Sequence, residues 1–191
     1  MSDGRPLILF VGGTSRPAST TERALRHCMA HAEALGAATR LIDGRFLSQL
    51  PLYDPDNPQR SDRERDFIAA VRACDGIVVA TPGYHGSLSG PVKNALDWLE
   101  DTAGDQRPYL TDRAFGPIVT AYGWQACCTA LVSLRLIAHA LRAWPTPMGA
   151  TVNAAARPFN GQGSCVDQQA AFQLTLVTEQ VVEFCRMRRA L

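Results

Sequence analysis

Short, continuously apolar runs alternate along the chain with longer stretches in which apolar residues recur at helical spacing. The first run, residues 7–11, is apolar throughout, as expected for a strand buried on both faces of a sheet. Four later runs have a similar short and largely apolar character. The pattern predicts five strands, at residues 7–11, 38–42, 76–81, 115–121 and 148–152.

The amphipathic stretches between these runs predict helices. Leu25, Cys28 and Ala32 form one apolar stripe, and Ser61 followed by Glu64 is a capping box at a helix start. Pro91 suits the first turn of a helix, where its missing N–H has no cost. The predicted helices cover residues 21–35, 61–73, 90–100, 126–143 and 167–188, and the proline-rich segment 50–58 is a predicted surface loop.

This alternation predicts an α/β fold with a doubly wound parallel sheet, right-handed crossovers and helices on both faces. We expect one domain spanning residues 1–191, with the five strands in the flavodoxin-like order 2-1-3-4-5. In such a sheet the ligand binds beyond the carboxyl ends of the strands, at the switch point between strands 1 and 3. The turns after these two strands are therefore the first candidates for a site.

The turn after the first strand, residues 12–21, combines two glycines, several hydroxyls and Arg16, and it leads into a helix. Free N–H groups and the helix dipole make such a turn an anion site. The chain has neither the G-x-x-x-x-G-K-[ST] motif of a P-loop nor G-x-G-x-x-G after this strand. What remains is a flavodoxin-like site in which hydroxyls hold one terminal phosphate.

At these two turns the sequence resembles the NAD(P)H-dependent FMN reductases. Residues 13–21, GTSRPASTT, are similar to the family's G-S-x-R-x-x-S-x-N turn. Residues 81–98, TPGYHGSLSGPVKNALDW, are similar to its T-P-E-Y-N-x-S-x-x-G-x-L-K-N-x-I-D-W signature. The resemblance covers most of the first 125 residues, including a Leu52-Tyr53-Asp54 loop after the second strand.

The resemblance implies a flavoenzyme with FMN as cofactor and NAD(P)H as co-substrate. It places the FMN phosphate on Thr14, Arg16, Ser19, Thr20 and Thr21, with Ser15 contributing its backbone N–H. The residues that it places along the flavin ring or close to it are Pro82, Gly83, Tyr84, His85, Gly86, Ser87, Tyr122 and Gly123. Because the flavin carries out the redox chemistry, no catalytic acid or base is expected.

The implied reaction moves a hydride from NAD(P)H to FMN and then electrons to a small-molecule acceptor, with ping-pong kinetics. The family includes quinone, azo-dye and chromate reductases, and flavin reductases that supply a partner monooxygenase. Two alternatives stay open: a non-enzymatic electron carrier of the flavodoxin type, and a flavin-binding sensor or interaction domain.

Three departures from the family pattern concern the site. Gly83 stands where the family has Glu, and His85 where it has Asn. The third loop, often Gly-Gly in the family, reads Tyr122-Gly123-Trp124 here. His85 either donates to the flavin or acceptor, or is a turn residue whose backbone alone matters. For Tyr84, Tyr122 and Trp124 two roles remain, namely contact with the flavin or packing in the core or at an interface.

Composition and charge limit the classes of partner and the cellular location that the sequence predicts. The formal net charge is +1 without long Lys or Arg runs, which argues against nucleic-acid binding. No apolar run approaches the ~20 residues of a membrane span, and no signal peptide is evident, so a cytoplasmic protein is expected. The six cysteines match no zinc spacing and are interpreted as core thiols. Adjacent Cys127 and Cys128 are not expected to form a redox pair.

We also expect a homodimer or homotetramer. Trp98 lies outside the apolar stripe of its helix, and the loop at residues 50–58 is long and rich in proline. The family resemblance implies, in addition, an active site completed by a neighbouring subunit.

Overall fold

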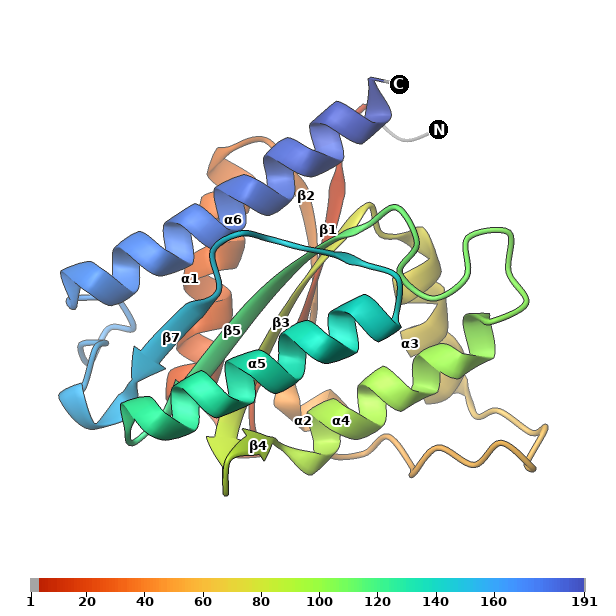
Figure 1. Cartoon of the computed structure of the whole chain (residues 1–191), viewed down its shortest axis with the longest axis horizontal. Coiled ribbons are helices and arrows are strands. Elements are labelled where there is room, and N and C mark those ends of the chain that lie inside the picture. Colours follow the sequence, from red (N-terminus) through yellow and green to blue (C-terminus); the bar gives the residue numbers. More distant parts are fainter. Residues whose placement is uncertain (1–3, 191) are drawn as a thin grey trace.

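The computed structural model describes residues 4–190 and shows a parallel sheet between two layers of helices (Figure 1). The sheet order is β2-β1-β3-β5, and both β6 and β7 pair in parallel with the outer edge of β5. The strands are β1 (Leu7–Gly12), β2 (Ala38–Ile42), β3 (Gly76–Tyr84), β4 (Ser87–Leu88), β5 (Ala114–Ala121), β6 (Trp144–Pro145) and β7 (Ala150–Asn153). The predicted flavodoxin-like fold is confirmed.

The fifth strand of the predicted order is interrupted, with β6 and β7 as its two parts. Trp144 N and Thr146 N donate to Arg113 O and Phe115 O at 2.9 Å each, whereas Met148 N donates to Gln180 Oε1 at 2.9 Å, so pairing with β5 stops after Thr146. The carbonyl groups released there are bound by Arg135, whose guanidinium donates to Thr146 O at 3.0 Å and to Pro147 O at 2.9 Å. The predicted strand 148–152 therefore begins later, at Ala150.

Helices cover both faces of the sheet. Helices α1 (Thr20–Ala34) and α6 (Gln168–Arg189) enclose one core layer, and α3 (Asp62–Ala73), α4 (Gly90–Asp97) and α5 (Trp124–Ala140) enclose the other. Alternate residues of β1 supply both layers: Phe10 packs beneath α1, and Leu9 packs on the opposite side. The expected layering follows directly from the apolar runs.

Several helix bounds differ from the pattern. A short α2 (Gly44–Leu47), which the sequence did not predict, begins where Asp43 accepts a hydrogen bond from Phe46 N at 2.8 Å. The predicted helix 90–100 ends as the 3-10 helix η1 (Trp98–Thr102), and a second 3-10 helix, η2 (Ala154–Ala156), follows β7. The capping box of Ser61 and Glu64 is present as predicted.

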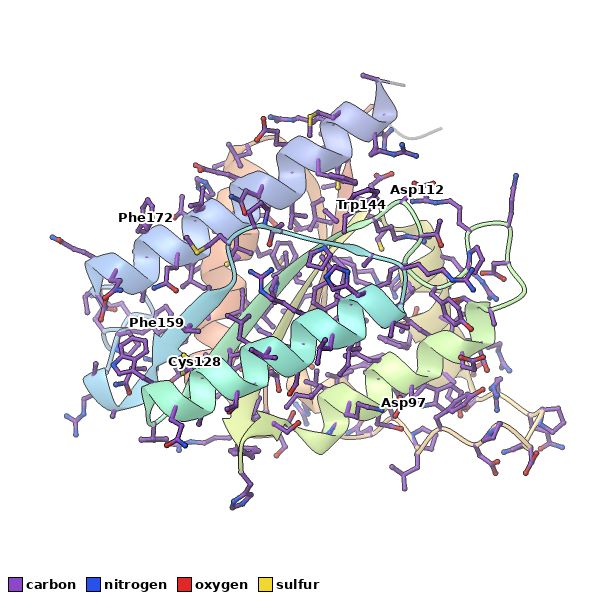
Figure 2. The ribbon with its side chains drawn as sticks, in the orientation of Figure 1. Asp97, Asp112, Cys128, Trp144, Phe159 and Phe172 are labelled. Atoms are coloured by element: carbon purple, nitrogen blue, oxygen red, sulfur yellow. The ribbon has the colours of Figure 1, made fainter. Side chains whose placement is uncertain are left out.

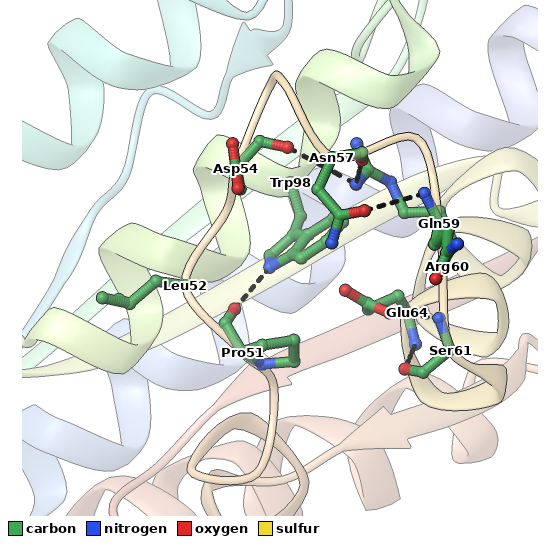
Figure 3. A pocket seen from close by; sticks show the side chains of 9 residues that line it. All are labelled: Pro51, Leu52, Asp54, Asn57, Gln59, Arg60, Ser61, Glu64 and Trp98. Carbon is green, nitrogen blue, oxygen red and sulfur yellow. Dashed lines mark hydrogen bonds between the residues drawn. The ribbon is translucent and has the colours of Figure 1, made fainter.

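Trp98 does not face a partner, and that part of the interface prediction is wrong. It is 1% exposed beneath the loop at residues 50–60, and its Nε1–H donates to Pro51 O at 2.8 Å (Figure 3). The Arg60 guanidinium lies 4.8 Å above the Trp98 ring and forms a bidentate pair with Asp101 at 2.7 and 2.8 Å. The second face of the helix therefore anchors this loop, beside a cavity of about 410 Å³.

A buried arginine organises the end of the sheet where β5 begins. Arg113 is 2% exposed and donates to Cys74 O at 3.0 Å, Arg72 O at 3.1 Å and Tyr109 O at 3.1 Å. Burial lowers the pKa of this guanidinium. The carbonyl groups that it binds belong to the segments leading into β3 and β5.

The six cysteines are free thiols. Cys28, Cys74, Cys127 and Cys185 are buried as expected, and burial raises the pKa of Cys28 to about 12. Cys128, in contrast, is exposed on α5, and Cys165 is half-buried. Cys165 packs against the core layer beneath α1 and α6, so Cys128 is the residue that departs from the interpretation as core thiols.

Candidate cofactor site

A cavity of about 640 Å³ lies beyond the carboxyl ends of β1, β3 and β5. This volume is within the usual range for small-molecule sites, about 300–1,000 Å³. Its lining consists of Thr14, Ser15, Arg16, Ala18, Ser19, Thr20, Thr21, Arg23, Pro82, Gly83, Tyr84, Thr120, Ala121, Tyr122, Gly123, Ala126, Ala154, Arg157, Pro158 and Phe159. Three arginines are present, and no Asp or Glu lines it in the described part of the chain.

The turn after β1 begins with two glycines in positive-φ conformations. Gly12 has φ of 136° and Gly13 has φ of 109°, and Gly13 N donates to Ala80 O at 3.2 Å. A Cβ on Gly12 would lie 1.8 Å from the same Ala80 oxygen, a distance that leaves no room for any side chain. The backbone thus leaves β1 in close contact with β3 and brings Thr14 and Arg16 to the cavity.

Donors remain free at the start of α1. Ser19 caps the helix by accepting from Glu22 N at 3.2 Å, and the Glu22 carboxylate accepts from Ala18 N at 3.0 Å. The hydroxyls of Ser15 and Thr20 and the guanidinium of Arg16 have no hydrogen-bond partner among residues 4–190. Together with the positive end of the helix dipole, they form an electropositive wall suited to a phosphate.

Thr21 has a different environment from its neighbours. It is 1% exposed, and its Oγ1 lies 2.6 Å from Oγ1 of Thr120 at the end of β5. This buried pair fixes the first turn of α1 against the sheet. The hydroxyl that the resemblance assigned to the phosphate is therefore already hydrogen-bonded to the protein.

The turn after β3 contributes only its first part to the cavity. Pro82, Gly83 and Tyr84 line it, whereas β3 continues into a hairpin with β4. His85 and Gly86 form the two-residue turn of this hairpin, with φ of 51° and 84°, as in a type I′ turn. His85, Gly86 and Ser87 are outside the cavity lining, and the exposed position of His85 favours its interpretation as a turn residue.

Gly83 is surrounded by the start of α5. A Cβ there would lie 3.1 Å from Ala126 O and 3.3 Å from the Ala121 Cβ, so a long side chain has little room. In the third loop, Tyr122 and Gly123 line the cavity. Tyr122 is 80% exposed at the cavity mouth, and Trp124, the first residue of α5, does not line it.

The segment after β7 forms a wall of the cavity that was not predicted from the sequence. Ala154, Arg157, Pro158 and Phe159 line the cavity, and Arg23 Nη1 donates to Asn160 O at 3.0 Å across to this segment. Figure 2 shows Phe159 beside β7. The signal was available in principle, because a fifth parallel strand ends at the same edge of the sheet as the first.

Comparison with known families identifies this arrangement. The sequence profile of the NADPH-dependent FMN reductases matches residues 6–157, which include every turn described above. The chain belongs to the NADPH-dependent FMN reductase family. This membership confirms the predicted family, the enzyme class and FMN as the family's cofactor.

Individual relatives differ in how much they share with this chain. An NADPH azoreductase of Bacillus sp. (strain OY1-2) is 36% identical over 63 residues, covering 32% of this chain and 35% of that protein. The NADH:(hydroxy)cinnamate reductase subunit CrdA of Vibrio ruber is 26% identical over 183 residues, 94% of this chain and 87% of that protein. This FMN reductase family member thus spans about a third of the first relative and most of the second.

Among solved structures, the fold matches FerB from Paracoccus denitrificans, a flavoenzyme NAD(P)H:(acceptor) oxidoreductase. The TM-score is 0.78 at 19% identity, and the match covers 95% of this chain and 98% of FerB. This similarity supports the fold alone.

The residues present fit FMN. Free hydroxyl and guanidinium donors at the start of α1 suit a phosphate, and the cavity continues over small or flat residues that leave room for a planar ring. In residues 4–190 no group of three or more His, Cys, Asp or Glu is arranged to hold a metal ion. No helix in the same range is long and apolar enough to cross a membrane.

Proposed function

We propose that this chain is an FMN-dependent NAD(P)H oxidoreductase that reduces a second small-molecule acceptor. The observation that carries the proposal is the cavity at the strand ends, with Arg16 and the start of α1 on one side and Gly83 and Tyr122 on another. FMN, when bound there, supplies the redox chemistry that links NAD(P)H oxidation to reduction of the acceptor.

The side chains of the site would bind and orient rather than transfer protons. Thr14, Arg16, Ser19 and Thr20, with the N–H of Ser15, would hold the phosphate. Pro82, Gly83 and Tyr84 would follow one edge of the flavin ring, and Tyr122 and Gly123 would follow another. No His, Lys, Asp or Glu lines the cavity in the described chain, so orientation and exclusion of water are the contributions expected of the protein.

NAD(P)H and the acceptor are expected to bind one after the other at the same position in the cavity. Tyr122 lines the cavity and is 80% exposed, and we infer that NAD(P)H and the acceptor occupy the same space beside it. Steady-state rates measured at several concentrations of both substrates should therefore give parallel double-reciprocal lines. Intersecting lines would contradict the ping-pong scheme, and absence of NADH or NADPH oxidation with any acceptor would contradict the proposed activity.

The acceptors for which the relatives are named differ in chemical class. One relative is named for azo reduction and another for (hydroxy)cinnamate reduction, so membership of the family does not determine it. We propose a small molecule such as a quinone, an azo compound or free flavin. A screen of both nicotinamides against these three classes, with free FMN as one of them, measures which acceptor supports the largest kcat/KM.

We also propose that the protein is a homo-oligomer that associates through α5. Trp124, Cys128, Val132 and Leu136 recur every four residues on this helix and are exposed, Leu136 by 66%. The helix contains no Asp, Glu or Lys, and its Arg135 is bound to backbone carbonyls. Two copies packed through this uncharged stripe meet no like-charge repulsion, which favours a second copy of the chain as the partner.

A single charge in this stripe should separate the subunits. Leu136→Glu is expected to give monomers at micromolar concentration, because two carboxylates would be buried at the contact, whereas the fold should persist. Phe172→Glu, on α6 and 61% exposed, is the matched control and should leave the mass unchanged. Light scattering measures the outcome, and a monomeric wild-type protein would contradict the proposal.

A further inference from the structure

Arg157 reaches the cavity from a rigid support. It follows η2 in a left-handed conformation, with φ of 50° and ψ of 56°, and its N–H donates to Ala154 O at 3.2 Å. The next two residues are buried, and Pro158 O accepts from Val166 N at 2.8 Å. The segment is therefore held on both sides of Arg157, although a left-handed non-glycine residue carries a conformational cost.

The Arg157 guanidinium has no partner in the part of the chain that the structure describes. Among residues 4–190 it makes no ion pair, side-chain hydrogen bond or ring contact, and the side chain is exposed. Arg23, in the same cavity, is instead committed to Asn160 O at 3.0 Å. Arg157 therefore presents a positive charge, on a fixed segment, to a cavity that no carboxylate lines in the described part of the chain.

The charges of the cavity exceed the needs of one phosphate. A phosphate monoester carries close to two negative charges at neutral pH, and Arg16 and Arg23 flank the start of α1, where the phosphate is proposed to bind. Arg157 comes from a different element, the segment after β7, and is the surplus charge. It is available for a second anionic group.

We propose that Arg157 is a specificity residue that binds an anionic group of the substrate, rather than the FMN phosphate. The inference rests on the proposed function and identifies the class of substrate that the cavity prefers. The shared chemistry is a phosphate, carboxylate or sulfonate oxygen that a guanidinium recognises through charged hydrogen bonds. The group belongs either to the 2′-phosphate of NADPH or to an acidic acceptor.

Substitutions at two matched arginines test this. Arg157→Gln removes the charge and Arg157→Lys retains it, and Arg142→Gln is the control. Arg142 is also exposed and left-handed, with φ of 62°, but lies outside the cavity lining. For each variant, FMN dissociation constants come from fluorescence titration, and calorimetry of the FMN-loaded protein compares NADP⁺ with NAD⁺. Turnover compares naphthoquinone with its sulfonated form.

In Arg157→Gln we expect affinity for NADP⁺, or kcat/KM for the sulfonated quinone, to fall by about tenfold or more, the effect of losing a charged hydrogen bond. NAD⁺, the neutral quinone and the FMN dissociation constant should stay within about twofold. Arg157→Lys should recover part of the loss, and Arg142→Gln should behave as wild type. A loss confined to NADP⁺ identifies the 2′-phosphate, and one confined to the sulfonate identifies the acceptor.

Two results would overturn the inference. Weaker FMN binding in Arg157→Gln would assign this arginine to the cofactor phosphate, and equal losses for charged and neutral ligands would make it structural. Failure of the proposed function is a separate result, namely no nicotinamide oxidation by the wild-type protein. Calorimetry still tests the role of Arg157 in that case, because it requires no turnover: NADP⁺ compared with NAD⁺ tests the 2′-phosphate, and the sulfonated compared with the neutral quinone tests the acidic acceptor.

Discussion

Gly12→Ala should destabilise the protein by more than about 4 kcal/mol, a loss that few single substitutions cause. The Cβ would lie 1.8 Å from Ala80 O, far inside the sum of the van der Waals radii of the two atoms, and φ of 136° is a conformation that alanine rarely adopts. Relief requires β1 and β3 to separate at the centre of the sheet. Urea denaturation followed by circular dichroism measures the change in free energy of unfolding.

A matched glycine shows whether the effect is local. Gly161 has open space around it and no positive φ, so Gly161→Ala should change stability by no more than about 0.5 kcal/mol. If Gly12→Ala unfolds at nearly the wild-type urea concentration, the close approach of β1 to β3 described here is wrong.

Arg16→Ala should weaken FMN binding by about 1.5–3 kcal/mol, the usual contribution of a hydrogen bond to a charged group, or roughly 10- to 150-fold in dissociation constant. Arg16 is exposed at the start of α1 and has no ion-pair partner among residues 4–190. Its removal therefore leaves no carboxylate unpaired, and stability should be nearly unchanged. Quenching of FMN fluorescence on titration with protein measures the affinity.

The control for this loss is Arg142→Ala, which removes the same charge away from the cavity. It should leave the FMN dissociation constant within about twofold. If Arg16→Ala binds FMN as tightly as this control, the phosphate binds elsewhere, and the assignment of the turn after β1 is wrong.

Most of the fold could be predicted because the local sequence patterns of strands and helix starts agree with the rules by which strands are connected in a parallel sheet. The runs that form β1, β3 and β5 are apolar enough to be buried on both faces, and Ser61 with Glu64 marks a helix start by side-chain chemistry alone. The strand order then follows from connection rules, and it places the turns after β1 and β3 together. Hence the turns that carry Arg16, Gly83 and Tyr84 could be placed from their positions in the sequence, whereas the roles of Gly83 and Tyr84 toward a flavin were implied by the family resemblance.

The remaining site features depend on contacts between distant residues. The hydrogen bond of Thr21 to Thr120 joins residues 99 positions apart, and nothing local distinguishes Thr21 from Thr20. Trp98 is covered by a loop that ends about forty residues earlier in the sequence. Its position on the helix alone therefore gave the wrong prediction, a contact with a partner. Arg157 follows a strand that is divided into β6 and β7. The prolines in that region made the fifth strand the weakest of the five strand predictions.

The burial of Arg113 has an evolutionary consequence. Its guanidinium joins the segments leading into β3 and β5, whereas the residues that meet a ligand are carried by the opposite ends of the same strands. Substitutions that alter the cavity leave these carbonyl contacts intact. Lineages can therefore exchange one acceptor for another without weakening the framework, and we expect variation to accumulate at Tyr122 and around Arg157 while Arg113 is retained.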